Sequence, residues 1–123
     1  GNTGVQLTFA YSYGSHQEIA GVARTLAKKV VSGQIDTSEI DVDLFESHLM
    51  TSELPPLDLL IRSGGEKRLS NFLLWQASYA EFVFTETLWP EFYPKNLRAA
   101  VDEFSLRQRR YGKTGEQVVQ SGI

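Results

Sequence analysis

The sequence predicts an α/β fold in which a parallel sheet carries helices on both faces. Three short segments have strand character, at residues 5–11, 57–61 and 81–85. Segments with helical periodicity stand between them and after the last one. This alternation of strands and helices is typical of a parallel sheet, because parallel neighbours need a crossover connection. At 123 residues with 41% hydrophobic side chains, one globular domain is expected.

The first strand is predicted at 5–11 because large apolar side chains recur at every second position. A helix is predicted to follow, since Ser15 and Glu18 have the spacing of a capping box, in which two side chains satisfy first-turn amides. Its apolar residues recur as far as Val30, and Gly33 stands where a left-handed residue ends a helix. The strand's apolar side chains are Val5, Leu7, Phe9 and Tyr11.

A second, short helix is predicted at about 41–50, with Asp36 or Asp41 as its cap and a stop at Pro55. The next strand, 57–61, is nearly all apolar, which is typical of a strand covered on both faces in a parallel sheet. A sheet of only three strands would leave long apolar edges open. We therefore expect further chain, N-terminal to this sequence, to belong to the fold.

Three more elements complete the prediction. Residues 72–80 read as a helix, and 81–85 read as a strand that stops before the Leu-Trp-Pro of 88–90. A long helix is predicted over 94–111, because it begins with a proline and its last turns are rich in arginine before Gly112.

Composition excludes several classes of protein. The net charge is −3, which argues against a general nucleic-acid binder, because such a protein needs a basic face to neutralise phosphates. There is no cysteine, so disulfides, thiolate metal sites and cysteine nucleophiles are excluded. No apolar run approaches the roughly 20 residues of a membrane span. The sequence begins without Met, and we expect the chain to be part of something larger.

The most informative stretch is residues 62–71, RSGGEKRLSN, directly after a predicted buried strand. Ligands of open α/β sheets bind at this edge. Arg62 and Arg68 can bond phosphate oxygens bidentately, Gly64–Gly65 allows close backbone approach, and a helix start near Ser70 adds partial positive charge. The stretch suits a diphosphate. It equally suits a solvated loop with an Arg–Glu pair, since no specific phosphate-loop motif is present.

Other candidate residues also leave two interpretations open. Glu81 suits a ligand for Mg²⁺ or an ordinary polar strand edge. His16 and His48 are isolated and favour helix-surface roles. The arginines of 107–110 favour a solvated helix end. Five aromatic residues suit either an apolar tunnel or plain core, namely Tyr13, Trp75, Phe82, Phe84 and Trp89.

Five stretches of the sequence closely resemble the cis-prenyltransferase family of undecaprenyl and dehydrodolichyl diphosphate synthases. The central match is 58–76, DLLIRSGGEKRLSNFLLWQ, and it continues through YAEF at 79–82 and LWP at 88–90. Upstream, YGSHQEI at 13–19 is similar to a motif that follows a central strand of the family. Downstream, RQRRYG at 107–112 resembles its arginine-rich C-terminal segment. These stretches are spread from residue 13 to residue 112, so the resemblance extends over nearly the whole chain.

The resemblance implies an enzyme that repeatedly condenses isopentenyl diphosphate with an allylic polyprenyl diphosphate, creating cis double bonds. It implies that Glu66 is a catalytic loop carboxylate that orients the arginines, and that Glu81 assists the cofactor Mg²⁺. Arg110 and Gly112 match an Arg-x-Gly element that binds the diphosphate of the neighbouring subunit in the family's dimers. The residues implied to bind isopentenyl diphosphate are Arg62, Arg68, Ser70 and Asn71.

The chain departs from the family in three respects. Ser63-Gly64-Gly65 replaces the more usual Thr-Ser-Gly, which exchanges one loop hydroxyl for a glycine and should be tolerated. Ser15-His16 stands where bacterial members often have Gly-Arg, so the role of that arginine is not carried over. The family's Asp-Gly-Asn-Arg-Trp segment, which supplies an Mg²⁺-binding aspartate and the allylic phosphate loop, does not occur. We therefore expect a C-terminal half, inactive alone, with residues 1–112 in the prenyltransferase domain and 113–123 as a polar tail.

The resemblance also implies partners and location. A homodimer is expected, with a heterodimer as the alternative, together with peripheral membrane association and a cytoplasmic or organellar location. Two rival functions stay open. One is a non-catalytic partner subunit of a heteromeric synthase, although such partners typically lose the arginine and glutamate loop that is present here. The other is an unrelated phosphate-binding α/β domain.

Overall fold

The structure is a computed structural model and describes residues 4–107. The described residues fall into two compact units: the first comprises residues 4–55 and 70–74, and the second comprises residues 56–69 and 75–107. The chain therefore crosses from one unit to the other three times. Among residues 4–107, no helix is both long enough and apolar enough to cross a bilayer.

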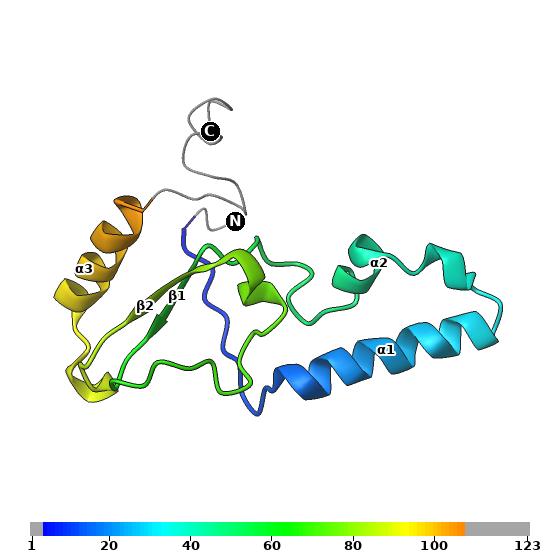
Figure 1. Ribbon diagram of the computed structural model, residues 1–123, viewed down its shortest axis with the longest axis horizontal. Helices are drawn as coiled ribbons and strands as arrows, with labels where there is room; N and C mark the ends of the chain where they lie inside the picture. The colour runs from blue at the N-terminus through cyan, green and yellow to red at the C-terminus, as the bar shows by residue number, and fades with distance from the viewer. Residues whose placement is uncertain (1–3, 108–123) are drawn as a thin grey trace, which may run out of the picture. The chain divides into compact units, whose positions relative to one another are not determined.

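The first unit is built around α1, Ser15–Val31, drawn in blue to cyan in Figure 1. Val22 and Leu26 are buried on one of its faces. Lysines occupy the last turn, where positive charge complements the helix dipole. Gly33 has φ +70° and its N–H donates to the carbonyl of Val30 at 2.9 Å. The predicted glycine end of this helix is thus confirmed.

The predicted capping box at the start of α1 is wrong. The N-cap is Gly14, and no side-chain cap from within the motif is formed. Ser15 and Glu18 are instead buried, at 0% and 5% exposure, and bond to groups outside the first turn. A burial of this kind is not visible in a four-residue spacing, because it depends on what packs over the helix.

Two short helices follow in the first unit. The 3₁₀-helix η1 spans Thr37–Glu39 and the α-helix α2 spans Val42–Glu46. Asp36 caps η1 and Asp41 caps α2, so each of the two predicted caps serves a different helix. The α-helix is shorter than the predicted 41–50 because turns follow Glu46.

The second unit holds a two-stranded parallel sheet. Strand β1, Leu59–Arg62, pairs with β2, Glu81–Phe84, in a register that sets Leu59 beside Glu81 and Arg62 beside Phe84. The predicted α/β class with a parallel sheet is confirmed. The core beneath it is buried Leu60, Ala77 and Ala80, with Leu57, Leu69 and Phe82 packed around them.

Helix α3, Pro94–Ser105, packs against β2, as Figure 1 shows, and the 3₁₀-helix η3, Trp89–Glu91, precedes it. Pro94 opens α3 as predicted, since its missing N–H would have no helical partner at that position. The helix ends six residues before the predicted limit of 111, and residues 108–111 lie outside the described residues.

Two predicted elements do not form. Residues 5–11 are not a strand, and their apolar side chains are 73–97% exposed. A strand needs a neighbour to accept its hydrogen bonds, and none pairs with this segment in the described part of the chain. Residues 72–80 contain only the 3₁₀-helix η2, Gln76–Tyr79. The stretch before η2 turns too sharply for a helix, with φ +49° at Leu73.

Candidate functional site

The loop of residues 62–68 leaves β1 at its carboxyl end and is anchored by its glycines. Gly64 and Gly65 have φ +88° and +78°. Their N–H groups donate to the carbonyls of Thr87 and Thr85, each at 2.9 Å. The backbone amides that we considered for an anion are therefore bonded to the segment that follows β2. An anion at this loop is therefore not bound by the N–H groups of Gly64 and Gly65.

Three of the predicted site residues meet in this loop. An Nη of Arg62 donates to the backbone carbonyl of Arg68, which brings the Arg62 guanidinium to the far end of the loop. The Arg68 guanidinium forms an ion pair with Glu66. The Arg68 and Glu66 side chains are 63% and 47% exposed, so this pair contributes little to stability. An incoming anion can replace Glu66 at small cost.

A residue that sequence reasoning missed lies against the same loop. A Cβ placed on Gly65 would lie 2.5 Å from Oε2 of Glu86, so the Glu86 carboxylate occupies the space that glycine leaves open. No spacing rule connects the two residues, because the contact arises where the chain leaves β2. Glu86 thus adds a negative charge beside the Gly64–Gly65 turn of the loop.

Glu81 lies at the other end of the strand pair from Arg62. The register separates their levels by three residues, or about 10 Å of strand. Oε2 of Glu81 accepts a hydrogen bond from Arg107 Nη1 at 2.9 Å. No group of three His, Cys, Asp or Glu side chains suited to a metal ion occurs among residues 4–107. Within the described residues, Glu81 thus has no further His, Cys, Asp or Glu side chains around it that would complete a magnesium site.

Arg107 is not a solvated helix end. It donates to Glu81, to the carbonyl of Phe82 at 2.8 Å, and to Glu103. Hydrogen bonds from Arg107 to Glu81 and Glu103 raise the pKa of its guanidinium. The three contacts fasten the end of α3 to the start of β2. Arg110 and Gly112, the other predicted site residues of this segment, lie outside the described residues.

Ser70 and Asn71 belong to the first unit, in the turn of residues 70–74. Ser70 is exposed and has φ +50°, and Asn71 has φ +64°. Asn71 bonds to the start of α1: its carbonyl accepts from Ser15 N at 2.8 Å, and its Oδ1 accepts from His16 N at 2.8 Å. The helix N-terminus that we predicted near Ser70 is absent. The turn is instead attached to the N-terminus of α1.

A buried polar group supports the start of α1. The Tyr13 hydroxyl donates to Glu18 Oε2 at 2.5 Å and lies 3.0 Å from Ser15 Oγ. Oε1 of Glu18 accepts from Met50 N at 2.8 Å. Sequence reasoning missed this group because it treated Ser15 and Glu18 as a local cap. The signal that was available is the pairing of a tyrosine with a serine and a glutamate within six residues.

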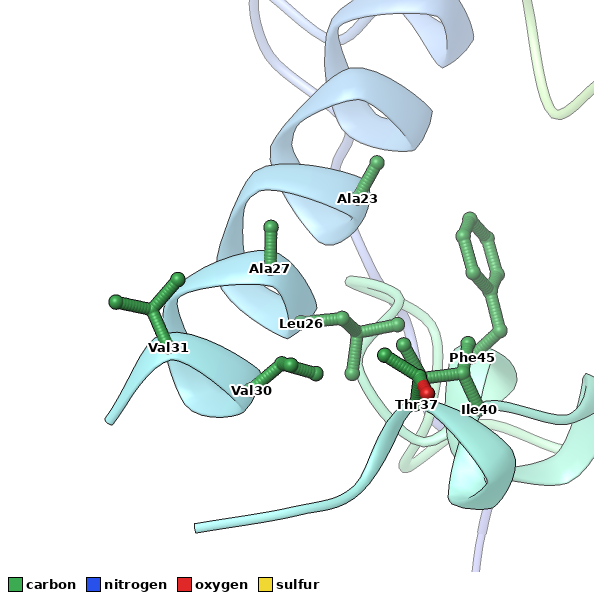
Figure 2. Close-up of a pocket in the computed structure, with 8 residues that line it drawn as sticks. All are labelled: Ala23, Leu26, Ala27, Val30, Val31, Thr37, Ile40 and Phe45. Atoms are coloured by element: carbon green, nitrogen blue, oxygen red, sulfur yellow. The ribbon is translucent and has the colours of Figure 1, made fainter. Parts of the chain in front are cut away.

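An apolar pocket of about 460 Å³ lies between α1 and the two short helices of the first unit. Figure 2 shows the α1 side chains on one side and those of Thr37, Ile40 and Phe45 on the other. Its lining includes none of the five aromatic residues considered for a tunnel. Two of those, Phe82 and Phe84, stack on one another with ring centroids 6.0 Å apart.

The two histidines have ordinary structural partners. His16 is exposed, and its backbone N–H is the one that Asn71 accepts. His48 Nε2 lies 2.7 Å from Lys29 Nζ, and its Nδ1 lies 2.8 Å from the carbonyl of Leu44. These contacts join α2 to the end of α1.

The comparisons with known proteins agree with one another. A family model described as undecaprenyl diphosphate synthase matches residues 1–112. The isoprenyl transferase of Porphyromonas gingivalis is 52% identical over 118 residues, which are 96% of this chain and 46% of that protein. The ditrans,polycis-undecaprenyl-diphosphate synthase of Acinetobacter baylyi is 51% identical over 121 residues, which are 98% of this chain and 49% of that protein.

A solved structure is also similar. The crystal structure of lavandulyl diphosphate synthase from Lavandula x intermedia, in complex with dimethylallyl diphosphate, superposes with a TM-score of 0.79 at 42% identity. The match covers 83% of this chain and 44% of that chain. The chain spans about half the length of the curated relatives it matches.

Proposed function

The chain belongs to the undecaprenyl diphosphate synthase family, as predicted, and from this membership we propose that the protein which carries it condenses isopentenyl diphosphate with an allylic polyprenyl diphosphate. The product would be a long-chain cis-polyprenyl diphosphate. This chain supplies the part of the enzyme that binds isopentenyl diphosphate. We expect no turnover from the chain alone, because the Asp-Gly-Asn-Arg-Trp segment, which supplies the allylic phosphate loop in the family, does not occur in its sequence.

One observation carries the proposal: the Arg62 guanidinium reaches the backbone of Arg68, across a loop at the carboxyl end of a parallel strand. Two guanidinium groups on one short loop can bond the same diphosphate, each through a planar fork that matches phosphate oxygens. The loop backbone is anchored by Gly64 and Gly65. The backbone that carries the charged side chains is therefore ordered before the anion binds, which reduces the entropy lost on binding.

The proposed role of these residues is binding and orientation. Isopentenyl diphosphate must be held with its double bond beside the departing diphosphate of the allylic substrate, so the rate depends on positioning and on charge. Arg62 and Arg68 hold one diphosphate. Glu66 is ion-paired with Arg68 and thereby orients that guanidinium until the phosphate oxygens take its place. No protein nucleophile is required.

Magnesium remains a proposal for the complete protein. Bound to diphosphate oxygens, it would neutralise charge on the leaving group. The residues described here do not fit it, because Glu81 is ion-paired to Arg107 and lies at the opposite end of the sheet from Arg62. We therefore assign Glu81 no step toward the metal, and we expect the ion to be held by groups outside this chain.

Four further residues enter the proposal from the family resemblance. Ser70 and Asn71 belong to the first unit, and we propose that they contribute to the binding of isopentenyl diphosphate. Arg110 and Gly112 lie outside the described residues, and we propose that they serve the diphosphate of a neighbouring subunit in a dimer. Association with the membrane surface follows from the chemistry of a long polyprenyl product, whose apolar tail favours lipid.

The proposal is tested by Arg68→Ala in the complete protein. Removing one charge-assisted clamp should raise the KM for isopentenyl diphosphate by about tenfold or more, and the KM for the allylic substrate much less. Lys67→Ala is the matched control, since it removes an exposed positive charge one position away and should leave both KM values nearly unchanged. Equal rises in both KM values, or an equal effect of Lys67→Ala, would refute the assignment.

A further inference from the structure

The turn of residues 70–74 has a costly backbone conformation. Ser70, Asn71 and Leu73 have φ of +50°, +64° and +49°. Left-handed geometry is accessible to asparagine but unfavourable for leucine, and each such residue costs about 1 kcal/mol or more. Strain of this kind persists only where neighbouring groups hold it. The contacts of the turn therefore identify the groups that stabilise its left-handed backbone conformation.

These contacts run to the start of α1 and form what we call the Asn71 clasp: Ser15, His16, Gln17, Asn71 and Leu74. Ser15 N donates to the Asn71 carbonyl, and His16 N donates to Asn71 Oδ1, both at 2.8 Å. Asn71 Nδ2 donates to Gln17 Oε1 at 3.2 Å, and Leu74 N donates to Ser15 Oγ at 2.8 Å. Both ends of the Asn71 amide are thus used within the first unit.

Asn71 does for α1 what an N-cap side chain ordinarily does. The N-cap position itself holds Gly14, which has no side chain to offer. Asn71 Oδ1 accepts a first-turn N–H from 55 residues away. A Cβ on Gly14 would lie 2.8 Å from Asn71 Nδ2, so the glycine leaves the space that the amide occupies. The cap of α1 and the turn of residues 70–74 therefore share Asn71, and we expect a change in one to alter the geometry of the other.

We propose that Asn71 is a positioning residue of the isopentenyl diphosphate site: it caps α1 and thereby fixes the strained turn that presents Ser70. This inference rests on the proposed function, because it concerns the same substrate. The positioning role differs from that of a direct ligand, because the amide N–H of a direct ligand would donate to the diphosphate. In the clasp that N–H donates to Gln17, and the neighbouring Oδ1 accepts from the helix.

The two roles predict opposite results for Asn71→Asp in the complete protein. Aspartate keeps the acceptor for His16 N–H and tolerates positive φ, so the positioning role predicts a KM for isopentenyl diphosphate within about threefold of the unmodified protein. Asn71→Ala loses the acceptor and should raise that KM by about tenfold, with kcat changed less. A direct ligand predicts that Asp is at least as damaging as Ala, because its carboxylate repels the diphosphate.

Two further variants keep the test independent of folding defects. Gly14→Ala keeps the Asn71 side chain, but its Cβ would lie 2.4 Å from Gln17 Oε1 and 2.8 Å from Asn71 Nδ2, so both groups must shift. It should raise the KM for isopentenyl diphosphate as Asn71→Ala does. Asp41→Ala is the matched control, since it deletes the cap of α2, where Leu44 N donates to Asp41 Oδ1 at 2.8 Å. It should lower the melting temperature and leave that KM unchanged. An unchanged KM in Gly14→Ala, or a raised one in Asp41→Ala, overturns the inference.

Arg68→Ala, measured alongside, separates the two proposals. If it leaves the KM for isopentenyl diphosphate unchanged, the proposed function fails and the inference falls with it. If it raises that KM while Asn71→Asp is as damaging as Asn71→Ala, the proposed function stands and only the positioning role is overturned.

Discussion

The loop of residues 62–68 and the turn of residues 70–74 are neighbours in the sequence, yet they belong to different units and are held in opposite ways. In the loop, backbone groups provide the anchoring, and the charged side chains of Glu66 and Arg68 stay exposed. In the turn, side chains take part in the anchoring: Asn71 Oδ1 accepts from His16 N, and the Oγ of fully buried Ser15 accepts from Leu74 N.

This difference predicts which substitutions change ligand binding and which change the stability of the fold. An exposed side chain can be removed without loss of folding energy, so its loss should be felt by the ligand alone. A side chain bonded to a buried partner leaves an unsatisfied group behind when it is removed, and the fold bears the cost. Substitutions of the exposed charged side chains of the loop should therefore change affinity with little change in stability, and substitutions of the buried side chains that support the turn should change stability.

The largest loss of stability is expected for Glu18→Ala, which removes a buried hydrogen-bond acceptor at the start of α1, where the turn is attached. It leaves the Met50 N–H and the Tyr13 hydroxyl without their buried acceptor, and should lower the free energy of unfolding by about 3 kcal/mol. Urea denaturation of the complete protein measures this. Glu18→Gln keeps an acceptor at the same position and should recover more than half of the loss. Equal losses in both variants would show that the carboxylate's bonds do not support the fold.

A smaller loss of stability is expected for Gly65→Ala, which disturbs the backbone turn that anchors the loop. Its φ of +78° alone should cost about 1 kcal/mol, and the contact of the new Cβ with Glu86 should add to this. Gly64→Ala is the matched control, because its φ is +88° but a Cβ there meets nothing within 4 Å.

The difference between the two alanine variants in denaturation midpoint isolates the Glu86 contact. In a Glu86→Ala background that difference should disappear. Were it to persist there, Glu86 would not be the group that Gly65 accommodates.

The smallest effect is expected at Asp36, the N-cap of η1. Its side chain is exposed, as are those of Glu66 and Arg68 in the loop, but it accepts a backbone hydrogen bond, as Asn71 does in the turn. Hydrogen bonds from the Ser38 hydroxyl and N–H hold the pKa of the Asp36 carboxyl below its usual value. A depressed carboxyl pKa stabilises the fold above the unfolded value of 3.8, and this contribution is lost as the pH falls through the folded pKa.

NMR titration of the Asp36 carboxyl group measures that pKa. Ser38→Ala removes the hydroxyl and leaves the N–H, so the pKa should rise part of the way to the unfolded value. An unchanged pKa would show that the hydroxyl contributes nothing to the cap.

Much of the fold was predictable because its signals are local. The α1 helix, its glycine end, the Asp41 cap and both paired strands follow from periodicity and capping chemistry within a few residues. The same rules predicted a strand at residues 5–11 and a helix at 72–80, and both were wrong. A strand depends on a partner, and the second segment is bent by a turn that is bonded to a distant helix.

The candidate site divides in the same way. The sequence by itself determined the family, through the motifs that resemble it, and the parallel α/β class, through the alternation of strands and helices. It also determined the arginine loop, because the residues of that loop are close together in the chain. Only the tertiary structure decided that Glu81 is ion-paired to Arg107, that Glu86 lies against Gly65, and that Asn71 caps α1. Those contacts join residues up to 55 positions apart. Spacing along the chain says nothing about which distant groups satisfy a buried or charged atom, since that is settled only when the elements pack.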